Sequence, residues 1–179
     1  MNSEQHTLSS EQQTTNSGRS AHHRAPCTVN RAPCTAVHRA PLSATTPVEI
    51  HFYDVDSLGI VWHGRYLKYL EEGREAFGRK FGVAYTDIYN SGYIAPIVDL
   101  HIRYLDMVAL NESLEVETAY VPTGAAKLIF DYTIRKQSGH TVVARAASTQ
   151  VFVTREGVME VSTPEFYRKW KEKWGVQEN

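Results

Sequence analysis

The fold is decided by residues 48–82, which read VEIHFYDVDSLGIVWHGRYLKYLEEGREAFGRKFG. Residues 48–53 alternate between apolar and polar side chains, which is the period of a half-buried β-strand. In residues 63–81 the apolar side chains change to helical spacing, and Gly82 is placed to end a helix. The stretch therefore predicts a strand, a turn-forming loop and one long amphipathic helix.

The predicted helix carries one apolar stripe, which should face the rest of the protein. Leu67, Leu70, Phe77 and Phe81 recur at helical spacing along it, and Arg74 lies in the same stripe. A helix with a single apolar face must bury that face against another layer of structure.

Four further segments alternate as strands do, at residues 97–105, 114–120, 128–134 and 142–153. In the first of them Val98, Leu100, Ile102 and Tyr104 fall on one face. Glycine-containing pairs at 123–124, 138–139 and 156–157 are typical hairpin signals, and residues 164–174 predict a short final helix that starts near a proline. Because helices and strands are segregated, the class is α+β, with one curved antiparallel sheet wrapped around the long central helix.

The first 46 residues differ in composition from the rest. They are rich in Ser, Thr, Gln, Asn, Arg and Pro, and contain three degenerate copies of a short Arg-Ala-Pro repeat. Such a segment cannot bury enough apolar surface to offset its ordering entropy. We expect residues 1–46 to form a disordered tail, a targeting segment or sequence upstream of the true start, and residues 47–179 to form one domain.

Composition narrows the possible functions. The formal net charge is −1, which gives no reason to expect nucleic acid or an anionic membrane as a partner. No apolar run is long enough to span a bilayer, and no secretory signal is evident, so we expect a cytoplasmic protein. The two cysteines, Cys27 and Cys34, lie in the predicted tail, where neither a disulfide framework nor a metal site is expected.

The loop between the first strand and the helix carries the residues of greatest chemical interest. Residues 52–66 place Asp54 and Asp56 before Gly59 and directly ahead of the helix. The first N–H groups of a helix lack intrahelical partners and suit a developing oxyanion, while a nearby carboxylate can attack a carbonyl or activate water. The same residues are also common as turn and cap formers, so spacing alone leaves both interpretations open.

This segment resembles the signature of the 4-hydroxybenzoyl-CoA thioesterase family, including its relatives associated with the Tol–Pal system. The resemblance runs from Phe52 through Tyr66 and continues to Glu71 and Arg74. It implies a hotdog fold and the hydrolysis of an acyl-CoA thioester to free acid and coenzyme A.

The resemblance also assigns roles to individual residues. Asp56 would be the catalytic carboxylate, as nucleophile or as general base, and the backbone N–H of His63 or Gly64 would stabilise the oxyanion. The His63 ring would orient water or substrate. No metal or cofactor is implied beyond the coenzyme A of the substrate. Because members of the family usually form dimers or tetramers, the resemblance also implies a homodimer or homotetramer in which each site is lined by two chains.

Other assignments remain open. Another branch of hotdog thioesterases places its carboxylate inside the helix, which makes Glu71 and Glu72 secondary candidates, although Glu71 is spaced to pair with Arg74. Arg65, Lys68, Arg103 and Lys127 are possible contacts for the phosphates of coenzyme A. The alternative functions are a 3-hydroxyacyl-thioester dehydratase, whose His-Phe-Pro-type motif is absent at residues 51–53, and a non-catalytic ligand-binding or scaffold domain.

Overall fold

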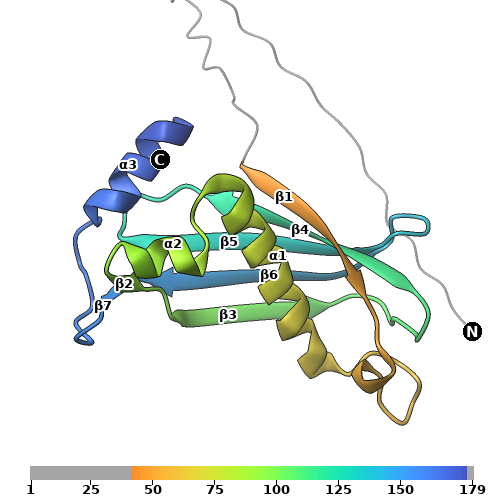
Figure 1. Ribbon diagram of the computed structural model, residues 1–179. Coiled ribbons are helices and arrows are strands. Elements are labelled where there is room, and N and C mark those ends of the chain that lie inside the picture. The colour runs from red at the N-terminus through yellow and green to blue at the C-terminus, as the bar shows by residue number, and fades with distance from the viewer. Residues whose placement is uncertain (1–41, 177–179) are drawn as a thin grey trace, which may run out of the picture. The chain divides into compact units, whose positions relative to one another are not determined.

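The computed structural model describes residues 42–176. A five-stranded antiparallel sheet in the order β1-β4-β5-β6-β3 crosses the long helix α1, and β2 pairs with β7 in a second small sheet (Figure 1). The elements are β1 (Ser43–Glu49), the 3-10 turns η1 (Phe52–Asp54) and η2 (His63–Arg65), α1 (Tyr66–Phe81), α2 (Tyr85–Asn90), β2 (Tyr93–Ile94), β3 (Ile97–Tyr104), β4 (Ser113–Val121), β5 (Lys127–Lys136), β6 (Val142–Val151), β7 (Val153–Thr154) and α3 (Glu165–Trp174). The expected α+β class, with an antiparallel sheet around one central helix, is confirmed.

The first strand differs from its prediction at both ends. It begins at Ser43 and ends at Glu49, whereas the alternating pattern predicted residues 48–53. Residues 52–54 form the turn η1, because the chain must bend there to enter the Asp56 loop. Residues 43–46, which were expected to belong to the tail, pair with β4 from Ser43↔Ala119 to Thr46↔Val116. The expected disorder of the preceding tail lies outside the described residues.

Truncation at two points tests how much β1 contributes to stability. A chain that starts at Pro47 loses the buried Ala44, its ladder with β4 and the hydrogen bond from the Tyr120 N–H to the Leu42 carbonyl, whereas a chain that starts at Leu42 keeps them. At about 1 kcal/mol for each lost hydrogen bond, we expect the Tm of the shorter chain to be about 5–10 °C lower. Equal Tm values in a thermal melt would show that these residues do not stabilise the domain.

Helix α1 buries most of the predicted stripe against the sheet. Leu70, Phe77, Phe81 and Arg74 are buried as expected. Leu67 was wrongly placed in the stripe, since 49% of its surface is exposed. The helix proper starts at Tyr66, after the tighter turn η2, and this changes which side chains face the sheet.

A glycine allows α1 to approach the sheet closely. A Cβ atom at Gly73 would lie only 2.5 Å from Thr118 Oγ1 and 2.8 Å from Val116 Cγ1 on β4. No real side chain tolerates such contacts, so any larger residue there would push the helix away from β4. This close packing fixes α1, and with it the loop that precedes the helix.

Strand β3 lies at the edge of the sheet and is more exposed than its pattern suggested. Val98, Leu100, Ile102 and Tyr104 were predicted to share one face. Ile102 packs against the core, whereas the exposed fractions of Val98, Leu100 and Tyr104 are 58%, 36% and 46%. β3 pairs with β6 on one side only. The apolar pattern is real, but within residues 42–176 no layer covers it.

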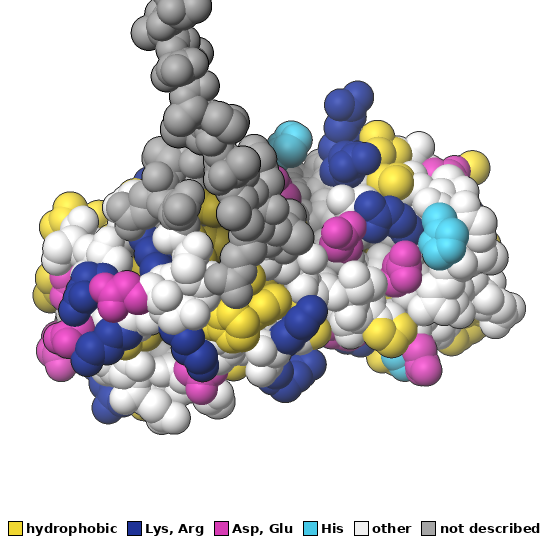
Figure 2. Space-filling model, turned by 90° about the horizontal axis from the view of Figure 1, so that it is seen from above, with side chains coloured by type: hydrophobic (Ala, Val, Ile, Leu, Met, Phe, Trp, Pro, Cys, Tyr) yellow, Lys and Arg dark blue, Asp and Glu magenta, His cyan; other side chains and the backbone are white. Residues whose placement is uncertain are grey.

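The C-terminal helix α3 packs against the end of α1. The indole N–H groups of Trp170 and Trp174 both donate to the Phe81 carbonyl, at 3.0 and 2.9 Å. The helix follows Pro164 as predicted. Its outer face carries ion pairs such as Arg168–Glu172, and Figure 2 shows charges of both signs mixed at that end of the molecule.

Candidate active site

Asp56 lies in a tight loop that orients its carboxylate. The Oδ1 atom accepts a hydrogen bond from the Leu58 N–H at 2.8 Å, and the Asp56 carbonyl accepts another from the Gly59 N–H at 3.0 Å. The Asp56 N–H donates to the Ile60 carbonyl at 2.9 Å. Within residues 42–176 the second carboxylate oxygen, Oδ2, has no partner. The loop therefore forms a turn, which was one of the two interpretations of the sequence. One oxygen of the half-buried carboxylate nevertheless remains free to contact a substrate or a water molecule.

The predicted oxyanion donors lie at the start of the helical segment. The Val61 N–H donates to the Val108 carbonyl and the Trp62 N–H to the Asp54 carbonyl, both at 2.8 Å. The next two amides, those of His63 and Gly64, open the turn η2, which leads directly into α1. Amides in the first turn of a helix have no intrahelical acceptor and carry the positive end of the dipole.

The glycine at position 64 accommodates the neighbouring indole. A Cβ atom there would lie 2.2 Å from Cζ3 of Trp62, so the ring rests directly over the Gly64 backbone. A larger residue at position 64 would displace Trp62 from this position.

His63 is exposed and is tied to the end of β3. The Tyr104 hydroxyl donates to the His63 carbonyl at 2.9 Å, and the two rings meet edge to face with centroids 6.5 Å apart. This contact joins the helix start to the sheet edge, and the imidazole remains open to solvent.

Asp54 is fully buried, and its role was missed in the sequence. Its Oδ2 accepts the His51 N–H at 2.9 Å and lies 3.5 Å from His51 Nδ1. Its Oδ1 lies 3.4 Å from Arg65 Nε, and Arg65 also donates to the Tyr53 carbonyl at 2.9 Å. Asp54 thus joins the strand end, the loop and the helix start, so it is more than a turn-forming neighbour of Asp56.

A tyrosine lies next to this buried carboxylate. Burial raises the pKa of the Tyr69 hydroxyl, and the negative charge of Asp54 raises it further. The hydroxyl therefore stays protonated and can serve as a donor close to Asp54 throughout the neutral pH range.

The other charged candidates are engaged in ion pairs. Glu71 pairs with the buried Arg74, as its spacing predicted. Glu72 lies 3.7 Å from Lys68, with both side chains partly exposed. Of the four basic residues considered for phosphate contacts, Arg103 and Lys127 are exposed, whereas Arg65 and Lys68 have the partners already given.

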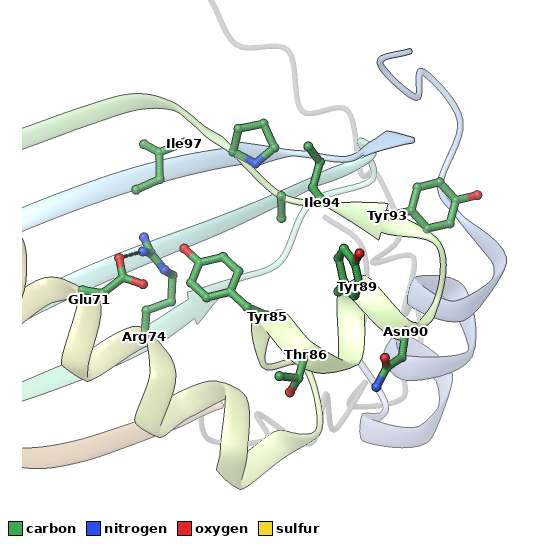
Figure 3. A pocket seen from close by; sticks show the side chains of 11 residues that line it. Glu71, Arg74, Tyr85, Thr86, Tyr89, Asn90, Tyr93, Ile94 and Ile97 are labelled. Atoms are coloured by element: carbon green, nitrogen blue, oxygen red, sulfur yellow. Dashed lines mark hydrogen bonds and ion pairs between the residues drawn. The ribbon is translucent and has the colours of Figure 1, made fainter. Parts of the chain in front are cut away.

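A cavity of about 670 Å³ lies between α1, α2 and residues 93–97. Of the candidate residues named from the sequence, Glu71 lines it, whereas Asp56, His63 and Gly64 do not. Figure 3 shows Glu71 and Arg74 joined at one end, with the ring of Tyr85 beside the guanidinium group. The structure therefore places Asp56 and the proposed oxyanion amides at the start of α1, and the cavity farther along the same helix.

Helix α2, which forms one wall of this cavity, was not predicted. It has only six residues, too few for an apolar period to show in the sequence. One local signal exists: Asp87 follows Ala84 by three residues and accepts its N–H at 2.9 Å. The short strands β2 and β7 were missed for the same reason, and the predicted long strand 142–153 divides into β6 and β7.

The described part of the chain holds neither a metal-binding cluster nor a membrane-spanning helix. Within residues 42–176 no three side chains of His, Cys, Asp or Glu gather in a way that could hold a metal ion. No helix in the same range has the length and apolar character required to cross a bilayer.

Comparison with known proteins gives a consistent result. Residues 50–170 match the model of the thioesterase-like superfamily. YneP of Bacillus subtilis (strain 168), provisionally named an acyl-CoA thioesterase, is 27% identical over 123 residues, which are 69% of this chain and 88% of that protein. The acyl-CoA thioesterase YbgC of Haemophilus influenzae is 26% identical over 115 residues, covering 64% and 82% respectively.

The fold is also that of a solved thioesterase. The structure of 4-hydroxybenzoyl CoA thioesterase from Pseudomonas sp. strain CBS-3 superposes with a TM-score of 0.62 at 21% identity. The likeness covers 72% of this chain and 98% of that one. The hotdog fold expected from the resemblance is confirmed.

Proposed function

The chain belongs to the thioesterase-like superfamily, and we propose that it hydrolyses an acyl-CoA thioester to the free acid and coenzyme A, with Asp56 as the catalytic carboxylate. The observation that carries the proposal is the loop itself. A carboxylate with one free oxygen is held just ahead of a helical turn whose first amides lack intrahelical acceptors. The relatives named as acyl-CoA thioesterases support the same reaction.

The geometry supports two routes through Asp56. As a nucleophile, its Oδ2 would attack the thioester carbonyl, form an acyl-aspartyl anhydride and release the coenzyme A thiolate, which takes a proton from water. Water would then hydrolyse the anhydride. As a general base, Asp56 would instead take a proton from a water molecule while the water oxygen attacks the carbonyl. The tetrahedral intermediate would then break its C–S bond, and the departing thiolate would take the proton back from Asp56. Both routes yield the acid and free thiol, and neither requires a metal or a redox group.

The surrounding residues have supporting roles in this proposal. The amide of His63 or Gly64 would donate to the oxyanion that forms as the carbonyl is attacked. The His63 ring, exposed beside Tyr104, would orient the attacking water or the thioester. Glu71 and Glu72 are the less favoured carboxylates, because each is already engaged in an ion pair on the helix.

The proposed assembly is a homodimer or a tetramer built from such dimers. Within the part of the chain that the structure describes, one backbone edge of β3 is unpaired, and the strand exposes Val98 and Leu100. Phe52 and Leu58 of the site loop are 82% and 79% exposed. An apolar strand with a free edge favours pairing with a second copy across a two-fold axis. Such a contact would also bring the second chain close to the loop of Asp56, through the Tyr104–His63 contact at the end of β3.

Charges on β3 should break this assembly. In the double variant Val98→Lys and Leu100→Lys, like charges face each other across the two-fold axis, and lysine on an edge strand opposes pairing. We expect the solution mass to fall from at least twice 20.2 kDa to that of one chain, with at least a tenfold loss of turnover. The control Val158→Lys, an exposed apolar position outside β3, should change neither. A fully active wild-type monomer in light scattering at assay concentration would contradict the proposed assembly.

The release of free thiol from a panel of acyl-CoAs tests the proposed activity. The panel should contain straight-chain acyl groups of two to sixteen carbons and a benzoyl group. Turnover of at least one member well above the uncatalysed rate is expected. Binding without turnover across the whole panel would favour a non-catalytic ligand-binding domain instead.

A further inference from the structure

The cavity beside α1 has a polar end and an apolar end. Glu71, Arg74 and Tyr85 meet at the end nearer the start of α1, as Figure 3 shows. The rest of the wall is mainly aromatic and aliphatic, with Tyr89 and Tyr93 followed by residues 94–97, whose sequence is Ile-Ala-Pro-Ile. A cavity of this kind suits a ligand that is polar at one end and hydrocarbon along the rest.

The polar end carries little net charge. The Arg74 guanidinium group pairs with Glu71 and lies 5.1 Å from the centre of the Tyr85 ring. Burial raises the pKa of the Tyr85 hydroxyl to about 12, so that group is neutral at physiological pH. Because the two charged lining residues neutralise each other, the cavity favours an uncharged occupant over a carboxylate or an ammonium group.

The distance along α1 sets a minimum length for that occupant. Glu71 follows Gly64 by seven residues, so the cavity begins roughly 10 Å along the helical segment from the proposed oxyanion amides, at about 1.5 Å per residue. A straight acyl chain advances by about 1.3 Å per carbon, given C–C bonds near 1.5 Å. A chain whose carbonyl lies at the amide of His63 or Gly64 therefore needs about eight carbons to reach the cavity.

The volume of the cavity points the same way. A volume of about 670 Å³ lies within the usual range for pockets that enclose a whole small molecule, about 300–1,000 Å³. A benzoyl group is smaller than such ligands and would leave much of the wall without contacts. A medium or long hydrocarbon chain fills it better.

We propose that this cavity binds the acyl chain of an aliphatic thioester of about eight carbons or longer. The chain would run along α1 from the helix start, pass the Glu71–Arg74 pair and end between Tyr89 and residues 94–97. The inference rests on the proposed thioesterase activity and adds a substrate class to it. Ile97, at the start of β3, then limits the length of chain that the site accepts.

Filling the cavity tests this assignment. Wild-type kcat/KM should rise about threefold to fourfold for each carbon added beyond about eight, which is the gain from removing one methylene group from water. Ile97→Trp and, independently, Ile94→Trp should lower kcat/KM for dodecanoyl-CoA at least tenfold and leave that for butyryl-CoA within about twofold. The control Val161→Trp places the same indole at a position that is 89% exposed and away from the cavity, so it should change neither substrate.

The outcomes separate the inference from the proposed activity. Preference for acetyl or benzoyl thioesters, or an equal effect of Ile97→Trp on all chain lengths, would overturn the inference while hydrolysis stands. If no acyl-CoA is hydrolysed, dodecanoyl-CoA binding should be measured by calorimetry. Tight binding that Ile97→Trp weakens at least tenfold would support the cavity assignment without the activity, whereas binding that the variant leaves unchanged would overturn both.

Discussion

Replacing Asp56 by asparagine is expected to lower kcat by roughly 10²-fold or more, the scale of a lost acid–base or nucleophilic group. Asparagine retains the side-chain oxygen that accepts the Leu58 N–H at 2.8 Å, so the turn should persist. The substitution removes the negative charge and basicity that both proposed routes require. KM should change much less, because most contacts with coenzyme A are remote from the reacting carbonyl.

Three further variants show whether the loss is specific to Asp56. Asp131→Asn makes the same chemical change at an exposed position on β5 and should have no effect. Glu72→Gln should also retain activity, since Glu72 pairs with Lys68 on the helix surface. A variant of Glu71 needs a thermal melt beside the assay, because Glu71 is the partner of the buried Arg74. Activity that survives Asp56→Asn and collapses in Glu71→Gln or Glu72→Gln would place the catalytic carboxylate on α1.

Replacing Asp54 by alanine is expected to destabilise the fold by about 2–3 kcal/mol. Loss of one partner from a fully buried pair costs about 3–5 kcal/mol, and the partial exposure of Arg65 and His51 reduces that figure by solvent screening. The corresponding fall in Tm is about 5–10 °C. Asp131→Ala is the matched control, because Asp131 is exposed and should tolerate the change.

Loss of Asp54 should also affect catalysis through the loop. Its carboxylate accepts the His51 N–H at the end of the strand and lies 3.4 Å from Arg65 Nε at the helix start, so it connects both ends of the Asp56 loop. The folded fraction of Asp54→Ala should therefore show a lower kcat at temperatures well below its Tm. If Tm and kcat both match those of Asp131→Ala, the buried network does not position the loop.

The strands and the helix with a clear apolar period could be predicted, because the spacing of their apolar side chains indicates which face is buried. β4 and β5 show strict alternation in the sequence, and in the structure Leu114, Val116, Leu128 and Phe130 are buried on one face. The central helix was predicted for a similar reason, and its C-terminal end follows from Gly82. Such patterns arise from local geometry, so a single sequence is enough to recognise them.

Features that depend on distant contacts could not be predicted in this way. The exposure of β3 follows from its place at the sheet edge, which its own apolar pattern does not reveal. The burial of Asp54 depends on Arg65 reaching back across the loop, whereas Asp56, two residues later, remains half-exposed. The cavity depends on α2, which is too short to show a period. Asp54 and Asp56 cannot be distinguished from the sequence pattern, because the difference in their burial arises from packing in the folded chain.

The rate of free thiol release, measured side by side for wild type and Asp56→Asn under single-turnover conditions, tests the central claim most directly. The enzyme should be in excess over an acyl-CoA that the wild type hydrolyses, and both proteins should have matched Tm values and solution masses. We predict a wild-type rate at least about 10² times that of the variant. Equal rates for the two proteins would contradict the assignment of Asp56 as the catalytic carboxylate.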